Sequence, residues 1–152
     1  MEERLRKRLA SQLSRGGIIL FAGAGFSCGA QNDAGKALPL GRDLRDLLWD
    51  LAFPGTEPDE SSSLGDVYGV AARQNRNRTE RLMRDLLTVS YRTLPEWYRI
   101  WFAAPWSRIY TVNIDDLEAA ANRAFDLPRD IEAVSGFDES VLPSERNLQV
   151  CI

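Results

Sequence analysis

Two short segments of this 152-residue chain combine residue types that could handle a nucleotide. The first is Gly-Ala-Gly-Phe-Ser at residues 23–27, directly after an apolar run at residues 18–22. Glycines at the end of a buried strand let the backbone approach a pyrophosphate closely, with N–H groups facing the anion. A left-handed conformation at Gly25 is one way to make that approach, and a side chain would resist it. Alone the signal is weak, because the dinucleotide fingerprint has a third glycine where Cys28 stands.

The second segment is Thr-Val-Asn-Ile-Asp at residues 111–115, where a strand is expected to lead into a helix. Ligands of open α/β sheets collect outside the carboxyl ends of the strands. If the two strands are neighbours, Asn113 and Asp115 lie beside residues 23–27 and can hydrogen-bond ribose hydroxyls or a carboxamide. The alternative is that Asp115 only caps the following helix, since Asp115 and Glu118 have the spacing of a capping box.

Several common site chemistries are excluded by composition. The chain contains no histidine and only two cysteines, Cys28 and Cys151. These residues therefore cannot form a Ser-His-Asp triad, a Cys-His pair or a His-ligated metal site. They also cannot form a four-cysteine zinc ribbon. The net charge of −3 argues against a generally basic nucleic-acid binder.

The elements that must position the two segments follow from apolar spacing. Strands are expected over residues 18–22 (fully buried, in a parallel sheet), 108–113, 131–134 and 148–152. Helices are expected over residues 2–15, 44–51, 63–72, about 82–89, 97–101 and 117–125. Residues 42–104 form a mostly helical insertion, and residues 126–147 form a loop-rich connection. The predicted fold class is therefore α/β, with a Rossmann-like parallel sheet that carries a helical insertion and no zinc ribbon.

The compartment is predicted from the chain's start and its thiols. The first residues, Met-Glu-Glu-Arg-Leu-Arg-Lys-Arg, are charged and do not resemble a signal peptide. No apolar run approaches the roughly 18–20 residues that span a bilayer. We therefore expect a cytoplasmic protein with both cysteines free and no membrane contact.

Taken together, Gly-Ala-Gly-Phe-Ser and Thr-Val-Asn-Ile-Asp resemble the Gly-Ala-Gly-x-Ser and Thr-x-Asn-x-Asp motifs of the sirtuin (SIR2) family. The loop at residues 37–44 stands where that family has its Gly-Ile/Leu-Pro segment. The missing zinc ribbon and the intervening helices are similar to the bacterial SIR2-like branch, whose members consume NAD+ in anti-phage defence. The resemblance covers essentially the whole chain, which would then be one SIR2-like domain over residues 1–152.

The resemblance implies an NAD+ glycohydrolase that cleaves NAD+ to nicotinamide and ADP-ribose, with NAD+ as substrate and no metal. It assigns NAD+ binding to Gly23, Ala24, Gly25, Phe26, Ser27, Asn113 and Asp115. Asn113 would be catalytic, orienting the ribose and the attacking water. Phe26 would wall the nicotinamide side, and Asp115 would contact the nicotinamide end. A homo-oligomer or a protein partner from a defence system is also implied.

Two departures from the family pattern leave alternatives open. The family's histidine follows the strand that residues 148–152 resemble, so we expect a chain truncated before that histidine and inactive by itself. A non-catalytic module that senses NAD+ or ADP-ribose is the alternative. The Asp-Phe-Arg of deacylating sirtuins is missing after Pro39, which makes an NAD-dependent deacylase the weaker third reading.

A cluster of aromatic residues and a cluster of arginines are each explained by structure without a ligand. An aromatic group between residues 97 and 106 has near-helical spacing, which favours core packing over base stacking. Five arginines between residues 73 and 84 are expected to form a solvated helix face, with an oligomer contact or nucleic acid as the alternative. Direct nucleic-acid binding by this domain is not expected.

Overall fold

The computed structural model describes residues 2–134 and 146–152. Four strands form an all-parallel sheet in the order β1-β2-β4-β3. They are β1 (Ile19–Ala22), β2 (Arg108–Thr111), β3 (Asp130–Val134) and β4 (Asn147–Cys151). The helices are α1 (Glu2–Ser14), α2 (Gly41–Ala52), α3 (Leu64–Leu87), α4 (Trp97–Ala103) and α5 (Leu117–Ala124), with a short 3-10 helix η1 (Ala24–Ser27).

This arrangement confirms an α/β fold with a parallel sheet, compatible with a Rossmann-like fold; the sirtuin-type fold remains a prediction. The predicted strands and the helical character of residues 42–104 are found where they were expected. Part of the predicted loop-rich connection, residues 135–145, lies outside the described residues.

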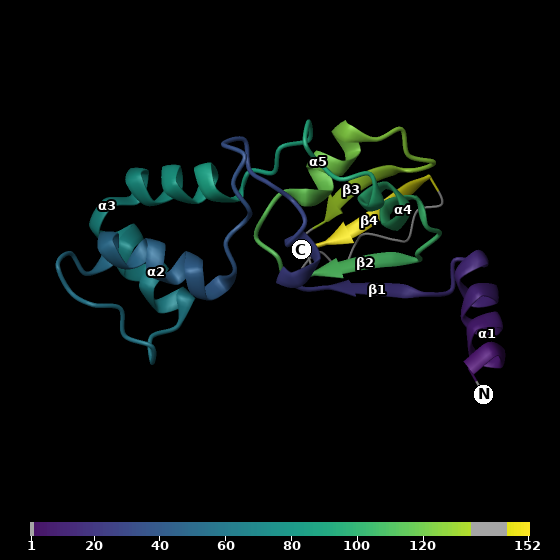
Figure 1. The fold of residues 1–152 in the computed structure, drawn as a ribbon, viewed down its shortest axis with the longest axis horizontal. Coiled ribbons are helices and arrows are strands. Elements are labelled where there is room, and N and C mark those ends of the chain that lie inside the picture. Colours follow the sequence, from purple (N-terminus) through teal and green to yellow (C-terminus); the bar gives the residue numbers. More distant parts are fainter. Residues whose placement is uncertain (1, 135–145) are drawn as a thin grey trace.

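The residues that the structure describes form two hydrophobic cores. In Figure 1, α4 and α5 lie against the sheet, while α2 and α3 form a separate lobe beyond the carboxyl ends of the strands. Buried residues of the sheet core include Ala22, Tyr98, Phe102, Ile109, Leu117, Leu148 and Val150. Those of the lobe include Leu44, Leu48, Trp49, Val67, Ala71 and Leu87. The carboxyl ends of β1 and β2 therefore face the junction between the two cores.

β1 is less buried than its sequence predicted. Leu20 and Ala22 pack in the sheet core, but Ile19 is 49% and Phe21 79% exposed. β1 is an edge strand, and α4 and α5 contribute to the core on only one of its faces. On the other face, Phe21 stacks on Tyr110 of β2 with ring centroids 5.2 Å apart. The prediction of a fully buried strand was therefore wrong.

The two helices predicted around residues 63–72 and 82–89 are the two parts of α3, which are separated by a kink. Asn75 interrupts it with non-helical φ −154° and ψ 83°. The predicted cap at Ser63 is confirmed, because its hydroxyl accepts a hydrogen bond from the Asp66 N–H at 3.1 Å. The five arginines are exposed, as expected of a solvated face: Arg73, Arg76, Arg78, Arg81 and Arg84. Across the described residues, no helix is both long and apolar enough to cross a membrane.

Hydrogen bonds from the end of α3 tie the lobe to the sheet. The Val89 N–H donates to the Asp116 carboxylate at 2.6 Å, just before α5. The Asn32 side chain donates to the Asp85 carbonyl at 3.2 Å, and the Ser90 N–H donates to the Gln31 carbonyl at 2.8 Å. The loop after η1 and the start of α5 are thereby both held to residues 85–90 at the end of α3.

The sheet core predicts the effect of truncating Ile109 in β2, which is 2% exposed. Ile109→Ala should lower the free energy of unfolding by about 2–5 kcal/mol, because it leaves a cavity in a packed core. Val112, which is 85% exposed, is the matched control, and Val112→Ala should change stability by no more than about 0.5 kcal/mol. Urea denaturation measures both, and similar small losses would contradict this assignment of the core.

Candidate functional site

The first predicted segment forms a tight turn at the end of β1. Gly23 is extended, with φ −112° and ψ −177°, and its carbonyl accepts a hydrogen bond from the Phe26 N–H at 2.8 Å. Gly25 is not in the left-handed region, so that possibility was wrong. Instead, a Cβ built on Gly25 would meet no atom within 4 Å. Gly25 thus leaves open space beside the turn.

The second segment lies directly beside the first. β1 and β2 pair in parallel, with Ala22 opposite Thr111, so their carboxyl ends are adjacent. The Asn113 side-chain amide donates to the Gly23 carbonyl at 3.2 Å and to the Ser27 hydroxyl at 2.8 Å. The Asn113 N–H donates to the Thr111 hydroxyl at 3.0 Å. The expectation that these segments come together is confirmed.

The Asn113 side chain is left with one unsatisfied atom. Asn113 is 8% exposed, and its Oδ1 is buried with no hydrogen-bond donor among the described residues. A buried acceptor without a partner costs about 1–3 kcal/mol. Because both amide hydrogens are used within the protein, this oxygen is the atom of Asn113 that remains for a ligand or a water.

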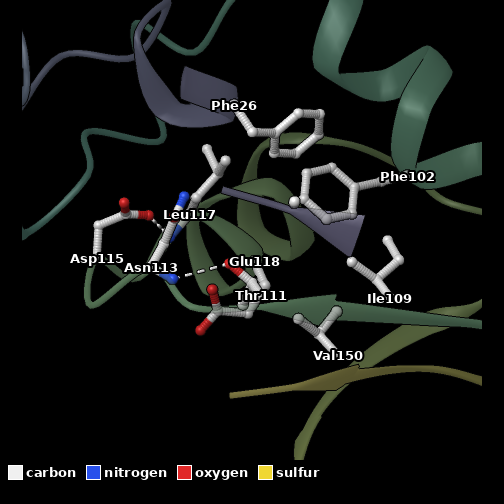
Figure 2. A pocket seen from close by; sticks show the side chains of 10 residues that line it. Phe26, Phe102, Ile109, Thr111, Asn113, Asp115, Leu117, Glu118 and Val150 are labelled. Carbon is white, nitrogen blue, oxygen red and sulfur yellow. Dashed lines mark hydrogen bonds between the residues drawn. The ribbon is translucent and has the colours of Figure 1, made fainter. Parts of the chain in front are cut away.

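Asn113 and Asp115 separate two adjoining cavities. The first has a volume of only about 20 Å³ and is shown in Figure 2, with Phe26 and Phe102 on one wall and Thr111, Asn113 and Glu118 on another. The second has a volume of about 160 Å³ and lies between the turn, the loop at residues 38–41 and the lobe. Asn113 and Asp115 line both. The first cavity has room for about one water molecule, so a larger ligand would occupy the second.

Phe26 is held in place by the aromatic cluster of α4. Its ring makes edge contacts with Tyr98 at 5.6 Å and Phe102 at 6.0 Å between centroids, and its carbonyl accepts a hydrogen bond from the Tyr98 hydroxyl at 2.8 Å. Burial raises the pKa of Tyr98 to about 12, so this donor keeps its proton at neutral pH. The prediction of core packing is confirmed for Tyr98 and Phe102, while Trp97 and Trp101 are 40% exposed.

Two carboxyl groups lie in the site, Asp115 and Glu118. Burial raises the pKa of Asp115, and a hydrogen bond from the Ser27 hydroxyl partly offsets the rise. Burial also raises the pKa of Glu118, with a further contribution from the negative charges of Asp115 and Asp116. Both groups are therefore easier to protonate than ordinary carboxyls.

The predicted capping box is not formed. Asp116, and not Asp115, is the residue before the first turn of α5, and its side chain makes no capping bond there. The Asp115 carboxylate accepts from the Leu117 N–H at 3.2 Å. Glu118 instead points into the first cavity (Figure 2). The Asp115 carboxylate therefore stabilises the turn before α5 and also lines the cavity.

Sequence reasoning did not place Glu118 or Tyr98 in the site, and it linked the loop at residues 37–44 to the site only through the family resemblance. Residues 38–40 of that loop line the second cavity. For Glu118 a signal existed, since the first turn of a helix that follows a strand lies at the ligand-binding edge of a parallel sheet. Among the described residues, no group of three metal-ligating side chains comes together.

The comparisons with known proteins identify no relative. No family model matches the chain, and neither the curated proteins nor the solved structures give a significant match. The two motifs and the geometry that joins them are therefore the basis for any assignment.

Proposed function

We propose that the chain is the NAD+-binding domain of a SIR2-like NAD+ glycohydrolase, of the type that serves bacterial anti-phage defence. The observation that carries this proposal is the buried, unpartnered Oδ1 of Asn113 between two cavities at the carboxyl ends of β1 and β2. An acceptor held there by two hydrogen bonds from its own amide suits a ribose hydroxyl or an attacking water. The proposed reaction is NAD+ plus water giving nicotinamide, ADP-ribose and a proton.

In this proposal the turn after β1 receives the pyrophosphate and adjoining ribose. Gly23, Ala24, Gly25 and Ser27 offer backbone N–H groups and an approach free of side chains, and Gly25 borders open space. Phe26, fixed by Tyr98, supplies an apolar wall for the nicotinamide ring. Asn113 orients the ribose and water, and Asp115 meets the nicotinamide end. No metal takes part.

Glycosidic cleavage also needs a base, and the resemblance assigns that role to a histidine. These 152 residues contain none. The chain by itself is therefore proposed to bind NAD+ without turning it over. We further propose a cytoplasmic location, where NAD+ is available, and activity within a homo-oligomer or with a protein partner.

The second candidate is a module that senses NAD+ or ADP-ribose without turnover. It is favoured by the lack of histidine, because every polar group at the site can bind a nucleotide without reacting with it. Deacylase activity is less well supported, since the chain lacks the Asp-Phe-Arg that deacylating sirtuins carry after their Gly-x-Pro segment.

The first test concerns turnover. The 152-residue chain should bind NAD+ in a calorimetric titration and release no nicotinamide on prolonged incubation, because it has no histidine base. A heat-denatured sample is the control for non-enzymatic release. Steady nicotinamide release by the chain would refute the proposed need for a histidine.

The second test concerns Asn113. Asn113→Ala should weaken NAD+ binding by roughly tenfold or more, because ligand donors lose the buried acceptor. The matched control is Asn122→Ala in α5, which removes an acceptor for the Ile131 N–H at 3.1 Å, outside the cavities. Both variants should lose some thermal stability, but only the first should lose affinity per folded molecule. If Asn113→Ala lowers the melting temperature and leaves affinity intact, its role is structural.

The third test concerns Gly25. Gly25→Val should fold normally, because its side chain meets open space, and should lose NAD+ binding severely by filling the room proposed for the pyrophosphate. Gly69→Val in α3 is the control, since Gly69 also borders open space but lies in the lobe and not in the turn after β1. Circular dichroism checks folding and calorimetry checks binding. Normal affinity in folded Gly25→Val would mean that the phosphates bind elsewhere.

A further inference from the structure

A groove with a volume of about 630 Å³ lies beside the second cavity, where α3 faces the loop after β2. Its apolar walls come from Leu64, Tyr68, Met83 and Ile114. Tyr68 is 38% and Ile114 57% exposed, so these walls are open to solvent. An open apolar groove that is rimmed by polar residues is typical of an interaction site.

Three arginines form a strip that continues from the groove along the second half of α3. Arg84 lines the groove, and Arg81 and Arg78 precede it at a spacing of three residues, which makes them neighbours on the helix surface. All three are exposed, and none forms an ion pair among the described residues. Glu80, the acidic residue that lines the groove, is already paired with Arg76 at 2.6 Å. The arginine strip is therefore a local excess of positive charge on a chain whose net charge is −3.

The arginine strip is unfavourable for the free protein. Like charges that are neighbours on a helix repel one another and lower its stability. Asp33 and Asp85 share a hollow with Arg84 but form no ion pair with it in the part of the chain that the structure describes. A negatively charged partner would remove this repulsion.

Positive charge beside an apolar groove indicates which kind of partner fits. The arginines attract an acidic ligand, and the groove has room for an apolar or aromatic side chain. A nucleic acid would satisfy the arginines, but its bases bind by stacking on aromatic rings, and Tyr68 is the only ring among the described residues that line the groove. An acidic protein segment supplies both carboxylates and apolar side chains, so it matches both parts of the surface.

We propose that the groove and the arginine strip form a docking surface for an acidic protein segment, which places an apolar or aromatic side chain in the groove. Leu64 and Ile114 line both the groove and the second cavity, so the docked segment lies directly beside the proposed NAD+ site. The surface would be the place of contact for the protein partner named in the proposed function. The inference itself rests on the groove and the arginines and not on NAD+ binding.

The experiment titrates the 152-residue chain with a random copolymer of glutamate and tyrosine and with polyglutamate of matched charge, using calorimetry. The copolymer should bind about tenfold more tightly than polyglutamate, because its tyrosines can bury apolar surface in the groove. Both affinities should fall as the ionic strength rises, because salt screens the arginine strip.

Variants separate the two parts of the surface. The double variant Arg81→Gln/Arg84→Gln should bind both polymers about tenfold more weakly, with an unchanged or slightly raised melting temperature, because it relieves repulsion on an exposed helix face. Arg4→Gln/Arg8→Gln on the exposed face of α1 removes the same charge and should leave both affinities unchanged. Tyr68→Ser should remove the preference for the copolymer and leave polyglutamate binding unchanged, and Ile114→Ser, at a more exposed position, should do the same. Circular dichroism checks that each variant is folded.

Three results would overturn the inference. Unchanged copolymer affinity in Arg81→Gln/Arg84→Gln would mean that the arginine strip does not hold the partner. A copolymer preference that survives in both Tyr68→Ser and Ile114→Ser would mean that the groove receives no side chain. Tighter binding of single-stranded oligothymidine of the same charge would assign the surface to a nucleic acid. None of these titrations contains NAD+, so their failure leaves the proposed function standing, and a failure of NAD+ binding leaves the docking surface standing.

Discussion

The site depends on one side-chain amide that joins the ends of two neighbouring strands. Asn113 donates both of its amide hydrogens to the turn after β1, to the Gly23 carbonyl and the Ser27 hydroxyl. These bonds fix the turn relative to β2 and orient the amide plane. The same geometry leaves Oδ1 buried, with no donor to it among residues 2–134 and 146–152. Asn113 thus holds the turn after β1 against β2, and its Oδ1 is the atom available to bind a ligand.

The second cavity beside this amide lies between two separate cores. The sheet core and the lobe core each bury their own side chains, and the space between them is lined by residues of both. A few hydrogen bonds set the relation of the lobe to the sheet, notably that from the Val89 N–H to Asp116. Binding sites commonly form at such junctions, because neither packed core has to be opened to admit a ligand.

The acidic character of the first cavity is achieved at the expense of stability. Asp115 and Glu118 are both harder to ionise than ordinary carboxyls, chiefly because they are buried, and their charges also disfavour one another. A packed core would gain by replacing either with an apolar residue. Perturbed acids that cluster in a cavity are typical of functional sites, where local stability is given up for binding or chemistry.

The sequence alone was sufficient for the order of the elements, the parallel sheet and the two segments at its carboxyl edge, because apolar spacing and strand-end glycines are local features. It could not show that α4 and α5 cover only one face of β1, or that Glu118 points into a cavity instead of capping α5. It also could not show which Asn113 atom stays unpaired. Burial and hydrogen-bond partners belong to residues far apart in the chain, such as Gly23 and Asn113, so only the tertiary structure decides them.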